Sequence, residues 1–236
     1  MKRNIYLLLS LVLIAKTTAF GQTNELIELK RMARKGDVNA QVSLAEKYAF
    51  GEGIKINLKK AFKWYSKAAE QSDTVAIYNV AYAYDSGEGT KKDLSMAFIW
   101  YQKSADLGYA DGQYNLAVCY DVGDGTEVNK EKAFHWYSVA AKNGQIHAQY
   151  NLGVSYALGE GCEKDNKKAF YWYHKSAQQG FEDAQFDLAL MYYHGDGIHE
   201  NKEEAIFWLH KAKLNGSEKA KELLLEIGHW NGNYFI

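Results

Sequence analysis

The chain of 236 residues contains no proline and only two cysteines, Cys119 and Cys162. Average proline usage is about 5%, so its absence favours many helices joined by turns that use glycine instead. A basic excess is also missing, since 28 Lys and Arg face 29 Asp and Glu, and this near-neutral charge argues against a nucleic-acid binder. With 47% hydrophobic and 24% charged residues, the composition is that of a folded globular chain and excludes intrinsic disorder.

The amino terminus has the pattern of a secretory signal peptide. Lys2 and Arg3 precede an apolar run over residues 5–15, which is followed by small residues up to Gly21. A basic start, a short apolar stretch and a small-residue cleavage site are typical of an exported protein, and the run is too short to span a bilayer, which needs roughly 20 residues. We therefore expect cleavage after residue 21 and an exported (periplasmic or secreted) protein, with a buried N-terminal helix as the alternative.

The remaining sequence repeats every 36 residues. The repeat is carried by columns of Trp, Gly, Ala and Tyr that keep one register without an insertion: Trp64, Trp100, Trp136, Trp172 and Trp208; Gly51, Gly87, Gly123, Gly159 and Gly195; Gly53, Gly89, Gly125, Gly161 and Gly197; Ala61, Ala97, Ala133, Ala169 and Ala205; Tyr48, Tyr84, Tyr120, Tyr156 and Tyr192. A fixed period of 20–50 residues predicts a solenoid or array.

Each repeat is expected to form an antiparallel pair of helices. The spacing of apolar residues predicts a first helix, for example over residues 111–122, and a second helix, for example over residues 130–143. A Gly-x-Gly turn separates them, followed by an Asp or Asn suited to cap the second helix: Asn57, Asp93, Asn129, Asp165 and Asn201. Glycine, or Ser72 in the first repeat, ends each second helix in the expected left-handed conformation.

These boundaries divide the chain as follows. A signal peptide (1–21) precedes an N-terminal capping helix (22–36). Five repeats follow at 37–72, 73–108, 109–144, 145–180 and 181–216, hereafter repeats 1 to 5, and a C-terminal capping helix and tail cover 217–236. Polar terminal helices keep a solenoid soluble.

The columns resemble those of Sel1-like repeats, relatives of the tetratricopeptide repeat. The segment 148–180 carries A-x-x-x-L-G/A-x-x-Y, G-x-G, D/N-x-x-x-A and W in phase. The resemblance implies an all-α, right-handed α/α superhelix with a concave face, and usually an adaptor role in protein complexes. The resemblance also implies an alternative function, because some secreted Sel1-like proteins bind or slowly hydrolyse β-lactams. Those are Cys-rich variants with a disulfide in each repeat, from which a chain with two Cys departs.

Sequence motifs for catalysis are absent. The chain has no S-x-x-K, G-x-S-x-G, H-E-x-x-H or P-loop motif, so we expect no enzyme activity, catalytic residue, metal or cofactor. The seven His are scattered over the repeat columns and are expected at the surface. We favour two unpaired thiols for Cys119 and Cys162, although a disulfide stays open.

An acidic residue occupies the middle of every Gly-x-Gly turn: Glu52, Glu88, Asp124, Glu160 and Asp196. Stacked repeats would align these carboxylates along one edge. We interpret the row first as solvated turn tips and second as a ridge for a cation or a basic partner.

An aromatic and apolar stripe on the first helices is the candidate binding site. A lone amphipathic helix would be polar on the side opposite its core, whereas here that side is apolar. By resemblance to tetratricopeptide domains, it would line a concave groove that binds a protein or peptide. The candidate partner-binding residues are aromatic anchors and a neighbouring amide column: Tyr78, Asn79, Tyr82, Tyr114, Asn115, Tyr150, Asn151, Phe186 and Asp187.

Two readings of this stripe are open. Its side chains could be partner anchors, or they could pack between repeats, with the amide column bracing the adjacent helix. The sequence therefore predicts an exported, non-catalytic scaffold that binds a protein or peptide partner, with no nucleic acid and no membrane segment after cleavage. The alternatives are a protein that binds or hydrolyses cell-wall peptides or β-lactams, and an exported structural factor without a stable partner.

Overall fold

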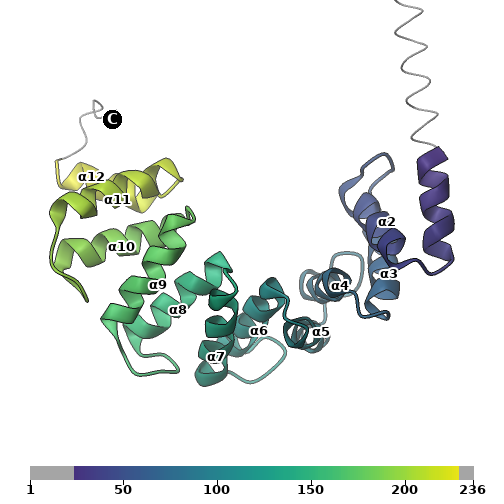
Figure 1. Ribbon diagram of the computed structural model, residues 1–236, viewed down its shortest axis with the longest axis horizontal. Coiled ribbons are helices and arrows are strands. Elements are labelled where there is room, and N and C mark those ends of the chain that lie inside the picture. Colours follow the sequence, from purple (N-terminus) through teal and green to yellow (C-terminus); the bar gives the residue numbers. More distant parts are fainter. Residues whose placement is uncertain (1–23, 229–236) are drawn as a thin grey trace, which may run out of the picture. The chain divides into compact units, whose positions relative to one another are not determined.

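The computed structural model describes residues 24–228, and these are all helices and turns. The chain divides into two compact units, with the division after Trp100 (Figure 1). We call these the N-terminal unit and the C-terminal unit and describe each by itself. The predicted signal peptide and residues 229–236 lie outside the described residues. Within residues 24–228, no helix is long and apolar enough to cross a membrane.

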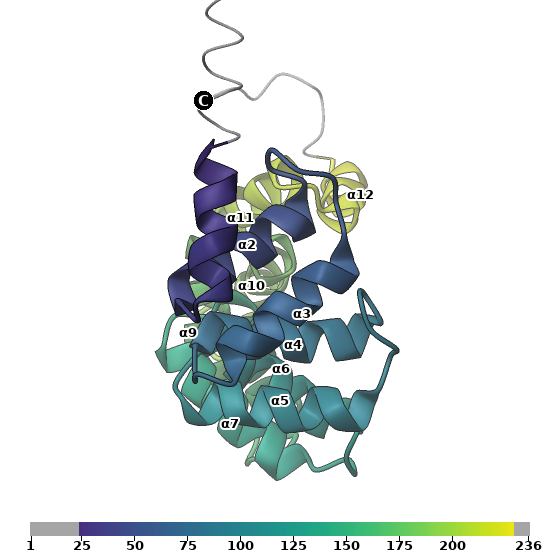
Figure 2. The same cartoon turned by 90° about the vertical axis from the view of Figure 1, so that its right-hand side faces the viewer.

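The N-terminal unit begins with a helix over residues 24–34. It continues with α2 (Val38–Phe50), α3 (Leu58–Ala69) and α4 (Thr74–Ser86), and it includes the start of α5 (Leu94–Asp106). Helix α3 packs against α2 and against α4, so the three helices lie in sequence order (Figure 2). Their small core contains Ala45, Ala68, Ile77 and Val80.

The C-terminal unit holds the end of α5 and seven further helices: α6 (Ala110–Val122), α7 (Lys130–Lys142), α8 (Ile146–Leu158), α9 (Asn166–Gln178), α10 (Glu182–His194), α11 (Lys202–Leu214) and α12 (Glu218–Glu226). From α6 to α12, consecutive helices pack against one another. The pairs α6–α7, α8–α9 and α10–α11 are the first and second helices of repeats 3, 4 and 5. The all-α array of helix pairs is confirmed, and its handedness stays a prediction.

The predicted helix ends are confirmed. The side-chain oxygen of the residue before each second helix accepts from a backbone N–H three residues on, at 2.8–3.0 Å; these residues are Asn57, Asp93, Asn129, Asp165 and Asn201. Gly36, Gly108, Gly144, Gly180 and Gly216 all have φ between 85° and 106°. Among the described residues, Ser72 is the only residue other than glycine with positive φ (66°).

The second glycine of the Gly-x-Gly turn has a packing role. A Cβ at Gly161 would lie 2.1 Å from the carbonyl oxygen of Lys130, at the start of the preceding second helix. Likewise, a Cβ at Gly89 would lie 2.3 Å from the carbonyl oxygen of Leu58, and a Cβ at Gly197 would lie 2.4 Å from that of Asn166. These turns therefore stack on the previous repeat where only glycine fits, which fixes the spacing between neighbouring repeats.

Buried glutamines connect the helices of neighbouring repeats. Gln113 Nε2 donates to the carbonyl of Ala105 at 3.4 Å, and Asn143 Nδ2 donates to Gln113 Oε1 at 2.9 Å. The same pairs recur elsewhere, as Gln41 with Gln71, Gln149 with Gln179, and Gln185 with Asn215. In these four repeats the first helix is thus hydrogen-bonded to the helix before it and to the end of its own partner helix.

Candidate functional site

In the N-terminal unit, the candidate stripe lies on α4. The exposed fraction of Tyr82 is 46%, whereas Tyr78 is half-buried. Asn79 Nδ2 donates to the carbonyl of Val75 in its own helix at 2.8 Å. Of these three predicted residues, Tyr82 is therefore the one with a largely open side chain.

In the C-terminal unit, Tyr114 on α6 is half-buried and surrounded by rings. Its ring centre is 6.1 Å from that of Tyr137 on α7 and 5.7 Å from that of His147 on α8. A side-chain hydrogen bond joins Tyr114 to Asn151 of the next repeat, and burial raises the Tyr114 pKa. Asn151 also bonds Tyr137, so this amide is engaged within the fold. Asn115, on the same helix, is half-buried.

The same contact recurs one repeat later. The Tyr150 hydroxyl on α8 donates to Asp187 Oδ2 on α10 at 3.0 Å, and the Tyr150 ring packs against those of Tyr173 and Phe181. Burial raises the pKa of both Tyr150 and Asp187. Phe186 beside them is half-buried and packs against the core. The contacts of Asn151 and Asp187 favour the bracing role that the sequence left open.

The most exposed part of this surface is the carboxyl end of the first helices. The exposed fraction is 72% for Phe50, 57% for Val122 and 64% for Leu158, the last residues of α2, α6 and α8. Val118 and Val154 lie one helical turn earlier and are half-buried. We call Val118, Val122, Val154 and Leu158 the apolar strip of the C-terminal unit. An exposed row of this kind is suited to bind another apolar surface.

Comparison with known proteins identifies the repeats. The profile of the Sel1 repeat matches residues 38–73, 74–109, 110–145, 146–181 and 182–217. The chain belongs to the Sel1 repeat family. Each matched Sel1 repeat begins one residue after the boundary expected from the sequence.

Solved Sel1 structures resemble this chain closely. A Sel1 repeat protein from Oxalobacter formigenes is 32% identical with a TM-score of 0.77, over 83% of this chain and 80% of that one. The protective antigen c5321 of uropathogenic Escherichia coli is 29% identical with a TM-score of 0.66, over 89% of this chain and 53% of that one. A putative Sel1 repeat protein from Klebsiella pneumoniae is 26% identical with a TM-score of 0.51, over 85% and 98%. A search of curated proteins gave no match.

The carboxylates in the turns of the Sel1 repeats differ in their surroundings. Glu160 pairs with Lys130 at 3.3 Å, and Lys130 also pairs with Asp121 at 2.5 Å, so these charges connect repeats 3 and 4. Glu52, Glu88 and Asp196 are exposed. Within residues 24–228, no group of three or more His, Cys, Asp or Glu is placed to hold a metal ion.

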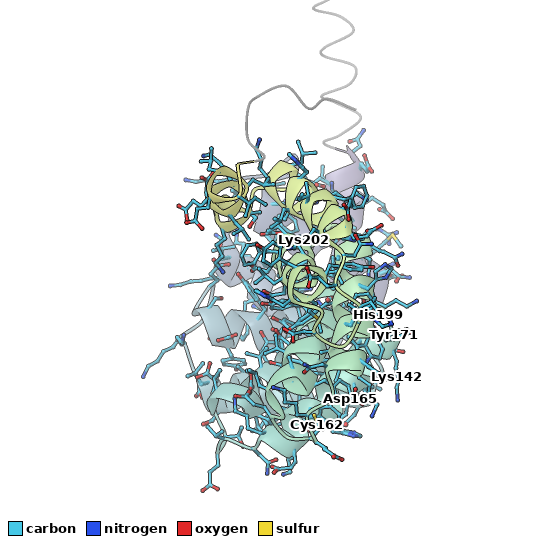
Figure 3. All side chains as sticks on the ribbon, turned by 90° about the vertical axis from the view of Figure 1, so that its left-hand side faces the viewer. Lys142, Cys162, Asp165, Tyr171, His199 and Lys202 are labelled. Atoms are coloured by element: carbon cyan, nitrogen blue, oxygen red, sulfur yellow. The ribbon has the colours of Figure 1, made fainter. Side chains whose placement is uncertain are left out.

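The two cysteines of the Sel1 repeats differ in burial. Cys119 on α6 is buried, whereas Cys162 is half-buried after its turn and contacts the carbonyl of Ser155 at 3.5 Å. Both are thiols in the structure, and burial raises the pKa of Cys162. Figure 3 shows Cys162 near Asp165 on the outer edge of the C-terminal unit.

Proposed function

We propose that this protein is an exported, non-catalytic scaffold that binds a protein or peptide partner along its first helices. The observation that carries the proposal is the apolar strip of the C-terminal unit, whose outermost residues Val122 and Leu158 are more than half exposed. Because α6 and α8 belong to adjacent repeats and each packs on the same helix, α7, we expect these residues to form one surface rather than isolated positions. The Sel1 repeats also support the proposal, because they form a generic protein-binding repeat fold.

Val122 and Leu158 would be the main anchors, with Tyr114 and Tyr150 behind them. The tyrosines are half-buried and hydrogen-bonded to the next repeat, so their edges would contact a partner while their hydroxyls hold the helices in place. In protein interfaces a few residues carry most of the binding energy, and tyrosine is enriched among them, so the edges of Tyr114 and Tyr150 would add to the contacts of Val122 and Leu158.

Charge would also select the partner. Helices α4, α6, α8 and α10 contain no Lys or Arg, and all of them except α8 contain carboxylates, among them Asp111, Asp121 and Asp183. Two of these are paired with lysines from other elements, Asp121 with Lys130 and Asp183 with Lys219. An acidic partner segment would find no cation on these helices, so we expect the bound segment to be apolar and neutral or basic.

Export is part of the proposal. Its support is the signal-peptide pattern of residues 1–21 and the similarity to c5321, which is a protective antigen. Fractionation of cells that produce the full chain should place a protein lacking residues 1–21 outside the cytoplasm. A cytoplasmic protein that retains Met1 would refute export by this signal.

The binding proposal is tested by changing the strip without changing the fold. In the double variant Val122→Asp and Leu158→Asp, two exposed anchors become charged, and we expect loss of partner capture from envelope extracts with little change in melting temperature. The matched control is Val128→Asp with Leu214→Asp. These residues are exposed by 58% and 81% but lie outside the strip, so the control should capture as wild type does. Equal capture by both double variants would refute the proposed site.

The absence of catalysis is tested separately. Purified protein should give no turnover of the β-lactam nitrocefin, as expected for a scaffold without a nucleophile motif. Turnover that survives further purification would favour the alternative, a protein that acts on β-lactams or cell-wall peptides.

A further inference from the structure

A hollow of about 320 Å³ opens on the second-helix side of the C-terminal unit, away from the apolar strip. It lies between α7, α8 and α9, and its apolar walls are Phe134, Leu152, Tyr156 and Trp172. The rings of Phe134 and Tyr156 pack edge to face, with 5.2 Å between their centres. This volume is at the lower end of the range for small-molecule sites, which are mostly apolar with a few placed polar groups.

The small side chain of Ser138 lies at this hollow. In the next repeat the corresponding position is His174, whose ring lies 6.0 Å from Phe170 and 5.8 Å from Trp208 and so fills the equivalent space. Trp208 is buried there, whereas Trp172 beside Ser138 is only half-buried. The serine therefore leaves one face of Trp172 uncovered in a way that the following pair of repeats does not.

The rim of the hollow carries donors and a positive charge. Lys142 and His135 lie at its edge with the Ser138 hydroxyl, and no Asp or Glu contributes to its lining. Lys142 is exposed, and within the described chain its ammonium group has neither a hydrogen bond nor an ion pair. The corresponding residues in the other repeats are Glu70, Asp106, Gln178 and Leu214, so the cation is specific to this repeat. Figure 3 shows Lys142 and Tyr171 on the same side of the unit.

We propose that this hollow binds a small aromatic carboxylate. The planar ring would lie against Trp172 and Phe134, where flat apolar surface is available. Its carboxylate would accept hydrogen bonds from the Lys142 ammonium and the Ser138 hydroxyl, and a charge-assisted bond of this kind is stronger than a neutral one. A cationic ligand would meet Lys142 without a compensating carboxylate. This site is separate from the apolar strip and does not depend on the proposed partner.

Calorimetric titration of the full mature chain tests the site, with phenylacetate and indole-3-acetate as probes. The amines of the same rings, phenethylamine and tryptamine, and the neutral amide phenylacetamide are the comparison ligands. We expect both acids to bind with one site per chain and the amines not to bind. Absence of acid binding at millimolar concentration, or equal binding of acid and amine, would overturn the proposal.

Two variants, each with the residue found at the same position of the next repeat, test whether the acids bind in the hollow. Ser138→His copies His174 and should fill the space, so acid binding should be lost. Lys142→Gln introduces the residue found at position 178, and this position is exposed. The affinity for the acids should fall about tenfold, whereas any affinity for phenylacetamide should not change. Ser66→His, at the same register in the N-terminal unit, is the control and should bind as wild type does.

The outcome does not depend on Ser138→His folding. Lys142 is exposed, so Lys142→Gln should melt as wild type does, and unchanged acid binding by this variant would refute the assignment of the carboxylate. A folded Ser138→His variant that still binds the acids would refute the assignment of the ring.

Discussion

Replacing Gly112 with alanine tests the packing between α5 and α6. A Cβ at this position would lie 2.3 Å from the Ser104 hydroxyl oxygen and 2.6 Å from its Cβ. The Ser104 hydroxyl is buried and has no hydrogen-bond partner among the described residues. The equivalent pairs before and after it have alanine at both positions, Ala68 of repeat 1 with Ala76 of repeat 2 and Ala140 of repeat 3 with Ala148 of repeat 4. Gly112 thus leaves room for Ser104 in this position, whereas at the same register of the next repeats Ser176 lies opposite Ala184 and its hydroxyl donates to the carbonyl of Ile146 at 3.0 Å.

The magnitudes follow from two opposed terms. Overpacking of a filled core costs about 1–3 kcal/mol, and replacing a glycine within a helix by alanine gains about 1 kcal/mol. We expect Gly112→Ala to lower the free energy of unfolding by up to about 2 kcal/mol. The double variant Ser104→Ala with Gly112→Ala restores the pair found in neighbouring repeats and should be at least as stable as wild type.

Urea denaturation of the wild type, both single variants and the double variant gives the coupling energy between the two positions. The packing account predicts that Ser104→Ala rescues Gly112→Ala. If the effects of the two substitutions simply add, the serine does not occupy the space of the missing Cβ and the account is wrong.

Three further predictions concern the backbone and one half-buried carboxyl group. Ser72→Gly should raise the free energy of unfolding by about 0.5–1 kcal/mol, because serine in the left-handed region costs energy that glycine avoids; lower stability in urea would contradict this. Gly144→Ala should cost about 1–2 kcal/mol from backbone strain alone, since open space surrounds it, whereas Gly161→Ala should cost about 3 kcal/mol or more because its Cβ would meet Lys130; equal losses would refute the stacking role of Gly161. Burial raises the pKa of Asp187, so the folded state binds this proton more tightly and stability falls as pH rises from the ordinary pKa through the raised one. Asp187→Asn, which copies Asn151, should raise the melting temperature at neutral pH and leave it unchanged at acid pH; a parallel shift at every pH would exclude titration of Asp187 as the cause.

The helix pairs could be predicted from local signals in the sequence. The caps at Asn129 and Asp165 and the left-handed glycines at Gly144 and Gly180 depend only on neighbouring residues. The array itself follows from the 36-residue register, since repeated units stack on one another. These features required no knowledge of contacts between distant residues.

Contacts between repeats were harder to predict. The pairing of Gln113 with Asn143 has a sequence signal, a polar pair thirty residues apart that recurs in four repeats. In the remaining repeat both positions are apolar, Ile77 and Leu107, so the two columns change together. The lysine above the tyrosine ring in three repeats, for example Lys132 above Tyr120 at 5.0 Å, could likewise be found only by comparing two columns.

The helix positions of the candidate residues could be predicted, but their contacts could not. Tyr114 and Tyr150 lie on the expected helix face, yet how much of each ring is covered depends on the next repeat, through Asn151 and Asp187. Helical periodicity gives the direction of a side chain but not its neighbours on another helix. The hollow beside Ser138 could not be predicted for the same reason, because its lining comes from three helices, α7, α8 and α9.

The binding of a partner along the apolar strip is tested most directly by photo-cross-linking in producing cells. A photoreactive phenylalanine analogue would replace Leu158 in the strip, or Leu214 outside it, since both side chains are exposed. The account predicts a discrete protein adduct from position 158 and none from position 214. Adducts only from position 214, or the same adducts from both positions, would contradict it.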